Sequence, residues 1–268
     1  MRRLLPIALL SALAAAGAAT AGGPSPGLSL GAAGVAGDGV RYVAVQAGRG
    51  TVVEKIRLRD GVVLRSRWLQ GRLGIPLVAY DGTAGGLSHD RRTLVLASFA
   101  AAPSTTTTRL AILDAKSLRL RAQATLEGAF SVDALSPDGA TLYLVQYTSL
   151  RYIDRYRVRA YDVAARRLLP GSIVDKREPK EPMAGAPVTR VTSQDGVWAY
   201  TLYSRADGTP FVHALNTAER FAVCLDLAWK GSFDALRKLD LRLSRDGAEL
   251  LLVRRDGTRV TSIETPAG

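Results

Sequence analysis

The residues best suited to chemistry form two charged groups near the middle of the chain. One group stands in the segment Arg-Tyr-Ile-Asp-Arg, and the other follows in a segment rich in Lys, Glu and Pro. Guanidinium and ammonium groups pair with phosphate and carboxylate, so a patch made from both groups would bind an acidic ligand. A solvated strand face beside a charged loop gives the same pattern, and both interpretations stay open. The candidate ligand-binding residues are Arg151, Asp154, Arg155, Lys176, Arg177, Glu178 and Lys180.

Residues that commonly carry catalysis or bind metals are few and far apart. The chain has two histidines, His89 and His213, and one cysteine, Cys224, which matches no zinc or haem motif. Residues 23–27 match G-x-S-x-G, but they form a Pro/Gly linker and not the strand-to-helix turn of a serine hydrolase. We therefore expect no catalytic residue, no metal and no cofactor, and we expect Cys224 to be a small core residue. An oxygen-only calcium site stays open among Asp81, Asp154, Asp175 and Asp207.

The charge of the chain favours an acidic partner. Its 268 residues include 36 Lys and Arg against 24 Asp and Glu, which gives a net charge of +12. Such an excess attracts acidic polymers, anionic lipid headgroups and nucleic acid. No nucleic-acid-binding motif accompanies it, so we do not expect nucleic acid as the partner. An Arg- and Ala-rich composition also arises from genomic base composition, and the charge alone therefore does not identify a ligand.

The N-terminal segment has the pattern of an export signal. Arg2 and Arg3 precede an apolar run from Leu4 to about Ala19, and small residues follow up to Ala21. The run is shorter than the ~20 apolar residues that span a bilayer. We expect residues 1–21 to be a signal peptide and the mature protein to lie outside the cytoplasm, in the periplasm or cell envelope or secreted. Contact with a membrane is expected only if this segment stays uncleaved.

A turn that contains aspartate recurs five times along the chain. A strand of large apolar residues follows each turn at once, as in Leu135-Ser-Pro-Asp-Gly before Thr141-Leu-Tyr-Leu-Val. Proline at the second position of the turn and glycine at the fourth favour a chain reversal. The intervals between the aspartates are 52, 48, 57 and 51 residues. We interpret Asp90, Asp138, Asp195 and Asp246 as structural turn residues and not as acids or bases, with Asp38 in the first, less regular turn.

Each repeat predicts four short strands. After the turn and its strand, a third strand ends in an acid or amide, as in Ala111–Asp114, and a fourth follows at once, as in Leu118–Leu126. Four antiparallel strands per repeat are typical of a β-propeller blade, so we expect an all-β propeller of five blades in residues 31–268. Only two strands remain after Asp246. The fifth blade therefore lacks an outer strand of its own. Residues 22–30, which precede the propeller domain, are either a linker or a ring-closing segment that supplies this strand.

The repeat also resembles a known family. The pattern Leu-Ser-Pro-Asp-Gly-x-x-Leu-Tyr, with a later strand that ends in Asp, resembles the YVTN-type β-propeller repeats over most of residues 28–265. The chain departs from that family because its units are fewer and longer. Lactonase-type propellers share this repeat style, and the resemblance implies an alternative function, hydrolysis of sugar lactones by carboxylate, Arg and His groups at the channel mouth. Asp154, Arg155, Arg177 and Glu178 would supply acids and cations, but no histidine falls in a rim loop.

Strand order divides the connections between two faces of such a propeller. One face, here called the short-turn face, receives the tight Asp-Gly turns, and the other, the long-loop face, receives the long connections. These long connections are residues 70–86, 100–109, 147–155, 175–187, 204–210 and 229–238. Loops of variable length carry binding sites more often than tight turns do. We therefore expect a monomeric, non-enzymatic scaffold that binds an unknown protein or an acidic envelope component at the long-loop face.

Overall fold

The computed structural model describes residues 28–29, 34–98, 107–149, 156–175, 177, 184–229 and 232–266. Within these residues the chain is all-β apart from one short helix, α1 (Phe233–Leu236). No helix in this part of the chain is long and apolar enough to cross a membrane. The predicted signal peptide, residues 1–21, lies outside the described residues.

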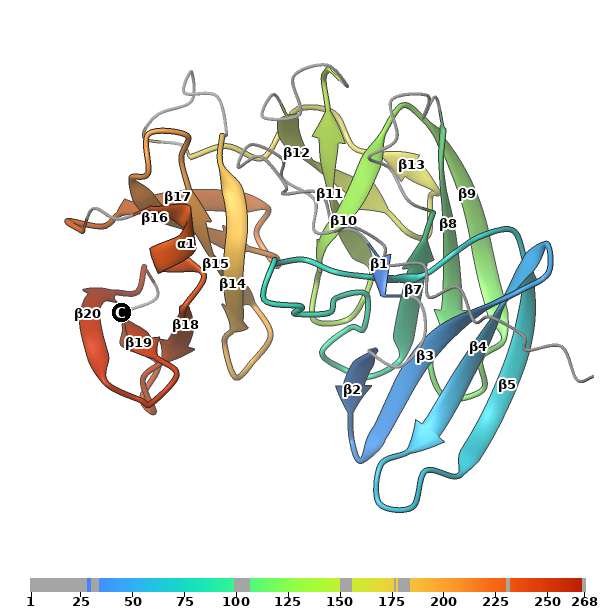
Figure 1. Cartoon of the computed structure of the whole chain (residues 1–268). Helices are drawn as coiled ribbons and strands as arrows, with labels where there is room; N and C mark the ends of the chain where they lie inside the picture. The colour runs from blue at the N-terminus through green and yellow to red at the C-terminus, as the bar shows by residue number, and fades with distance from the viewer. Residues whose placement is uncertain are drawn as a thin grey trace, which may run out of the picture.

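Five antiparallel sheets follow one another along the described chain (Figure 1). The first sheet contains β2 (Val35–Gly37), β3 (Val40–Ala47), β4 (Gly50–Arg57) and β5 (Val63–Gln70). The second contains β7 (Thr93–Ala97), β8 (Thr107–Asp114) and β9 (Leu120–Glu127), and the third contains β10 (Phe130–Leu135), β11 (Thr141–Tyr147), β12 (Tyr156–Asp162) and β13 (Arg167–Leu168). The fourth contains β14 (Ala186–Thr192), β15 (Trp198–Ser204), β16 (Pro210–Asn216) and β17 (Phe221–Asp226), and the fifth contains β18 (Leu239–Leu243), β19 (Glu249–Arg254) and β20 (Arg259–Glu264).

The expected all-β fold with repeated antiparallel sheets is confirmed, but the number of strands per sheet is not uniform. The second and fifth sheets contain three strands within the described residues. In the second sheet the inner position holds two isolated bridges to β7, Leu87 with Leu94 and Gly74 with Ala97, and no continuous strand. Gly86, with a φ of 86°, interrupts the extended chain before Leu87. Leu28–Ser29 (β1) pairs with Ile75–Pro76 (β6) and not with the fifth sheet.

Four of the recurring turns share one hydrogen-bond network. In the clearest copy, the hydroxyl of Ser136 donates to Asp138 Oδ1 at 2.6 Å, and the backbone N–H of Ala140 donates to the same oxygen at 3.0 Å. The N–H of Thr141 in turn donates to Ser136 Oγ at 2.9 Å. The same bonds recur around Asp90, Asp195 and Asp246. The serine hydroxyl, followed by the backbone N–H, holds the pKa of Asp138, Asp195 and Asp246 below the usual range.

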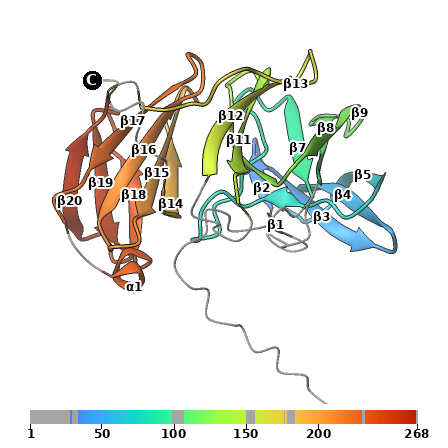
Figure 2. The same cartoon turned by 90° about the horizontal axis from the view of Figure 1, so that it is seen from above.

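Apolar side chains fill the space between neighbouring sheets. The first and second sheets bury Tyr42, Ala44, Val53 and Leu69 against Leu94, Leu96, Ala111 and Leu113. The fourth and fifth sheets bury Tyr200, Leu202 and Val212 against Leu239, Leu241, Leu250 and Leu252. Figure 2 shows the fourth and fifth sheets side by side, with β14 next to β18. These apolar interfaces supply the main free energy that holds one sheet on the next.

Residues 71–87, here called the crossing segment, connect the first sheet to the fourth (Figure 1). The N–H groups of Tyr80 and Asp81 donate to the carbonyls of Pro187 and Val188 on β14, each at 3.0 Å. The ring of Tyr80 also meets the ring of Phe233 edge to face, with 5.9 Å between the ring centres. The expected long connection of residues 70–86 is therefore an ordered link between distant sheets.

Candidate functional site

Most of the predicted site lies outside the described residues. The residues outside are Arg151, Asp154, Arg155, Lys176, Glu178 and Lys180. Arg177 is described, and its guanidinium donates to Asp175 Oδ2 at 2.7 Å and to the carbonyl of Cys224 at 2.6 Å. Burial raises the pKa of Asp175, but the hydrogen bonds from Arg177 and from the N–H of Cys224 outweigh it and hold that pKa at about 2. Arg177 therefore ties this segment to the outer strand β17.

A polar row crosses the fourth sheet, and the sequence analysis did not identify it. Arg190 on β14, Thr201 on β15, His213 on β16 and Cys224 on β17 lie opposite one another in register. Arg190 Nε donates to Thr201 Oγ1 at 2.7 Å, and His213 Nδ1 lies 3.9 Å from Cys224 Sγ. Burial lowers the pKa of His213 to about 4, so its imidazole is neutral at pH 7. Counting strand register from the turns would have placed these side chains on one face.

A salt bridge between the third and fourth sheets continues this row toward the centre. Asp133 lies at a bulge of β10, where the register shifts between Val132 and Ala134. Its carboxylate pairs with the guanidinium of Arg190, and the side chains are only 3% and 6% exposed. Because two buried charges are expensive to leave unpaired, this pair holds β10 and β14 in fixed relative positions.

A groove of about 980 Å³ opens on the long-loop face beside α1. It lies where the β17–β18 connection meets the β19–β20 hairpin, and its charged and aromatic lining is Trp229, Asp234, Arg237, Lys238, Arg254, Arg255 and Asp256. We call it the long-loop groove. Arg237 approaches Asp234 at 3.8 Å, whereas Lys238, Arg254 and Arg255 form no ion pair with a carboxylate of the described residues. Ser232 caps α1 by accepting the N–H of Ala235.

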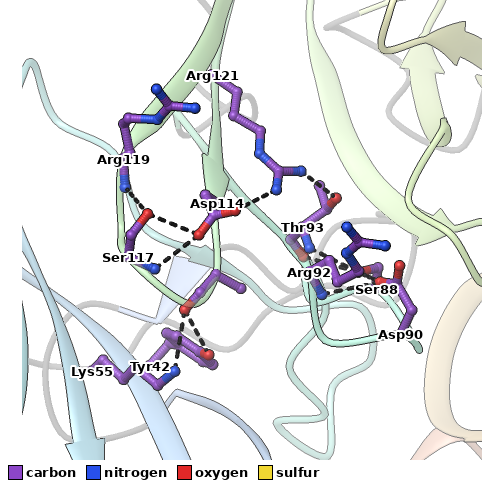
Figure 3. Close-up of polar contacts among 11 residues, drawn as sticks. Tyr42, Lys55, Ser88, Asp90, Arg92, Thr93, Asp114, Ser117, Arg119 and Arg121 are labelled. Atoms are coloured by element: carbon purple, nitrogen blue, oxygen red, sulfur yellow. Dashed lines mark hydrogen bonds and ion pairs between the residues drawn. The ribbon is translucent and has the colours of Figure 1, made fainter.

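A second groove, of about 500 Å³, opens on the short-turn face between the first and second sheets. Its cations are Lys55, Arg91, Arg92 and Lys116, and its carboxylates are Asp38, Asp90 and Asp114. We call it the short-turn groove. In Figure 3, Lys55 and Tyr42 both point to the carbonyl of Ala115, and their distances to this oxygen are 3.4 Å and 2.9 Å. The ammonium of Lys55 lies 5.5 Å from the centre of the Tyr42 ring.

Two of the three carboxylates in the short-turn groove are occupied by their own turns (Figure 3). Asp90 accepts the hydroxyl of Ser88 and the N–H of Arg92. Asp114 accepts the N–H and hydroxyl of Ser117 and pairs with Arg121, and these bonds hold its pKa far below the usual range. Lys55, Arg92 and Lys116 form no ion pair with a described carboxylate. The lining thus carries four cations against three carboxylates, and Arg121 from outside the lining offsets Asp114, which leaves a small positive excess for an anion.

A cavity of about 370 Å³ adjoins the short-turn groove near the centre of the molecule. The two hollows share Leu87 and Arg91 in their linings. His89 lies at the edge of this cavity, against the backbone of Gly196. Both described histidines thus lie in structural surroundings, one in a turn and one inside a sheet.

Comparison with known proteins gives a likeness in fold. No protein-family model matches the sequence, and no curated protein matches it. The structure is similar to that of hydrazine synthase from Kuenenia stuttgartiensis, with a TM-score of 0.50 and 14% identity, over 86% of this chain and 61% of that one.

Other similar structures include β-propeller proteins. The Dos1 propeller has a TM-score of 0.46 and 11% identity, over 84% of this chain and 55% of that one. TolB from Acinetobacter baumannii has a TM-score of 0.46 and 18% identity, over 82% of this chain and 49% of that one. The chain therefore spans less than two thirds of the length of each of these three proteins.

Proposed function

We propose that this protein is an exported, non-enzymatic β-propeller scaffold of five blades that binds an acidic envelope ligand at the long-loop face. The long-loop groove is the observation that carries the proposal. Lys238, Arg254 and Arg255 line one recess and have no described carboxylate as an ion-pair partner. Guanidinium groups bind phosphate and carboxylate through paired hydrogen bonds, and a recess strengthens the field that attracts them.

The two acids of the long-loop groove do not cancel these cations. The carboxylate of Asp256 accepts the N–H of Thr258 at 2.8 Å, and this bond belongs to the β19–β20 turn. Asp234 stands 3.8 Å from Arg237, so these two charges offset each other. Arg254 lies close enough to Asp256 to lower the pKa of that carboxyl, so this acid offsets part of its charge. The lining carries four cations against two carboxylates and thus leaves a positive excess for a ligand, beside the half-buried ring of Trp229. An indole ring next to guanidinium groups also favours a ligand with flat or apolar surfaces between its acids.

The remaining parts of the proposal rest on the repeat and the N-terminal pattern. Five successive antiparallel sheets support a count of five blades, one for each Asp turn. The basic start, apolar run and small residues of segment 1–21 support export and a location outside the cytoplasm. The predicted cations Arg151, Arg155, Lys176 and Lys180 lie outside the described residues, and we expect them in other connections of the long-loop face.

A binding measurement with charge-reversal variants tests this function. The probes are fluorescent polyphosphate and fluorescent polygalacturonate, titrated into the mature protein (residues 22–268) at low ionic strength. We expect Arg254→Glu combined with Arg255→Glu to weaken binding on the order of tenfold, equivalent to about 1.4 kcal/mol. The control is Arg245→Glu, which reverses one exposed charge of the fifth sheet, in the β18–β19 turn on the opposite face, and so makes half the charge change of the double variant.

The control decides between a local site and a general effect of charge. If Arg245→Glu costs half as much binding free energy as the double variant, or more, the protein attracts acids only through its net charge, and the proposed site is wrong. If neither variant changes binding, the long-loop groove is not the binding site. Binding of one probe and not the other would identify the ligand as a phosphate or a carboxylate polymer.

A further inference from the structure

Among the four turns that share the hydrogen-bond network, one differs from the other three at the position after its aspartate. Three copies have glycine there, Gly139, Gly196 and Gly247, with φ between 70° and 79°. The second sheet has Arg91 at this position, with a φ of 59°. Glycine adopts this left-handed conformation freely, whereas residues with a Cβ do so at a cost in stability. The structure therefore holds an arginine where the same turn elsewhere uses the unstrained residue.

The turn itself does not need this arginine. Ser88 and Asp90 make the same hydrogen bonds as the serine and aspartate of the three glycine-containing copies. The backbone N–H of Arg91 donates to the carbonyl of Ser88 at 3.0 Å, as the glycine N–H does in the other turns. Leu118, Arg166 and Arg220 hold a similar φ, between 55° and 61°, in other turns, so the conformation alone does not mark a site. What sets Arg91 apart is the position of its side chain. Strained backbone in a folded protein is often found at functional sites.

The Arg91 side chain lies across the first sheet at the edge of the short-turn groove. It passes over Gly37, where an added Cβ would stand only 2.8 Å from Arg91 Nε. The guanidinium thus occupies space that any other residue at position 37 would take. Arg91 lines both the short-turn groove and the central cavity, and 37% of its side chain is exposed. The described carboxylate nearest to it, Asp38 Oδ1, is 3.9 Å away, which is too long for a hydrogen bond.

Other cations of the groove can act with Arg91. The Lys55 ammonium uses one of its three N–H donors on the carbonyl of Ala115, which leaves two for another acceptor. Tyr42 lies under this ammonium and fixes its position. Lys116 and Arg92 are exposed residues that line the same groove. Figure 3 shows that Lys55 comes from the first sheet, whereas Arg92 comes from the turn of the second.

We propose that the short-turn groove is a second binding site, for a small ligand that carries a phosphate or carboxylate group. Arg91 holds the oxyanion through its planar guanidinium, and Lys55 and Lys116 add charge from either side of the groove. A volume of about 500 Å³ is in the usual range for small-molecule sites. This site lies on the face opposite to the long-loop groove and does not depend on the function proposed above.

A simpler explanation is that Arg91 only pairs with Asp38, and the two explanations predict opposite results. If the only role of Arg91 is to pair with Asp38, then Asp38→Asn lowers the melting temperature and leaves anion binding unchanged. If Arg91 holds a ligand, Asp38 competes with that ligand, because it places a negative charge beside the guanidinium. Asp38→Asn then strengthens anion binding, on the order of threefold.

The experiment is calorimetric titration of the mature protein with inorganic phosphate and, separately, with citrate. We expect Arg91→Gly to melt at the same or a higher temperature, because glycine relieves the left-handed strain, and to weaken anion binding about tenfold. The control Arg119→Gln removes an exposed cation near the groove that is not part of its lining, and we expect less than about a twofold change. The Arg254→Glu, Arg255→Glu variant leaves this binding unchanged, which separates the two proposed sites.

The proposal is supported if phosphate or citrate binds, and if this binding is weaker in Arg91→Gly and stronger in Asp38→Asn. The anion that binds more tightly is then the preferred oxyanion. Absence of binding of either anion to the unmodified protein overturns it. Equal binding by Arg91→Gly and the unmodified protein also overturns it, since the arginine would then have no part in holding the anion.

Discussion

The first two sheets and the last two are built from the same repeat but have different charge. Residues 34–127 contain 14 Lys and Arg against 7 Asp and Glu, whereas residues 184–266 contain 11 against 10. In the first region most cations, including Lys55, Arg92 and Lys116, form no ion pair with a described carboxylate. One turn motif can therefore support a strongly basic surface or a nearly neutral one, because the motif uses only backbone groups and its own Ser and Asp.

The two regions also differ in how far their apolar contacts extend. In the fourth sheet, Trp198 stacks on Tyr200 at 6.0 Å and meets Phe221 edge to face at 5.5 Å. In the first sheet the outer strand β5 leaves Trp68 56% exposed. The outer strand of the fourth sheet thus adds an aromatic ring to its core, whereas the outer strand of the first sheet buries Leu69 and leaves Trp68 largely exposed. The first pair also opens into the short-turn groove. We infer that the last pair contributes more to stability and the first pair more to binding.

The largest predicted effect concerns the salt bridge that attaches the last two sheets to the third. Asp133→Ala removes the carboxylate that pairs with Arg190 and leaves a guanidinium buried between the third and fourth sheets. We expect the free energy of unfolding to fall by about 3–5 kcal/mol. Urea unfolding followed by circular dichroism measures it. The control is Asp38→Asn, which removes one partner of the exposed Arg91–Asp38 pair, 3.9 Å apart. We expect it to change the free energy of unfolding by less than about 1 kcal/mol.

The next prediction compares apolar side chains of the two regions directly. Leu252→Ala removes a side chain buried between the fourth and fifth sheets, and we expect it to cost about 3 kcal/mol. Trp68→Ala removes a larger side chain from the exposed edge of the first sheet and should cost less than Leu252→Ala. Equal losses in urea unfolding would contradict the assignment of stability to the last pair.

A pH titration examines the fourth sheet alone. His213 is buried and its pKa falls to about 4, below the value near 6.5 of an exposed histidine. The unfolded chain therefore binds a proton before the folded one, and stability falls as the pH decreases between these two values. We expect a loss of about 2 kcal/mol between pH 6.5 and 4.5. In His213→Gln this part of the pH dependence should disappear, and a persistent slope would assign it to other groups.

The smallest predicted effect concerns the turns, in which the two regions agree. Ser88→Ala and Ser244→Ala each remove the hydroxyl that bonds to the turn aspartate, in the second and fifth sheets. We expect losses of about 1 kcal/mol in both, and of similar size. A much larger loss in one region would show that the motif, and not only the charge and packing around it, differs between them.

The sequence predicted the strands well because the turn chemistry is local. The expected strand Thr141–Val145 begins at the first residue of β11, and Ala111–Asp114 ends at the last residue of β8. Serine, aspartate and glycine at fixed positions determine where the chain reverses, so the strand after each turn begins at a predictable residue. The same signal could not show that the second sheet has an incomplete inner strand, because this depends on the φ of Gly86.

The candidate sites depend on contacts between distant residues, which the sequence does not show. The ammonium of Lys55 contacts the carbonyl of Ala115, which lies 60 residues later in the chain. The side chain of Arg91 passes over Gly37, which belongs to another sheet. Of the seven residues of the predicted site, the structure describes only Arg177, and the role of the other six stays a prediction. The one available signal was Arg91 itself, since it replaces the glycine found in the four other copies of the turn.

The crossing segment has a consequence for the order in which the molecule folds. The backbone N–H of Tyr80 donates a hydrogen bond to the carbonyl of Pro187, which lies 107 residues later in the chain. The hydrogen bonds between the crossing segment and the fourth sheet therefore cannot form until β14 has been synthesised and lies beside that segment. Contacts of such large sequence separation slow the final step of folding. We expect a fast phase in which individual sheets form and a slow phase in which the crossing segment joins the first sheet to the fourth.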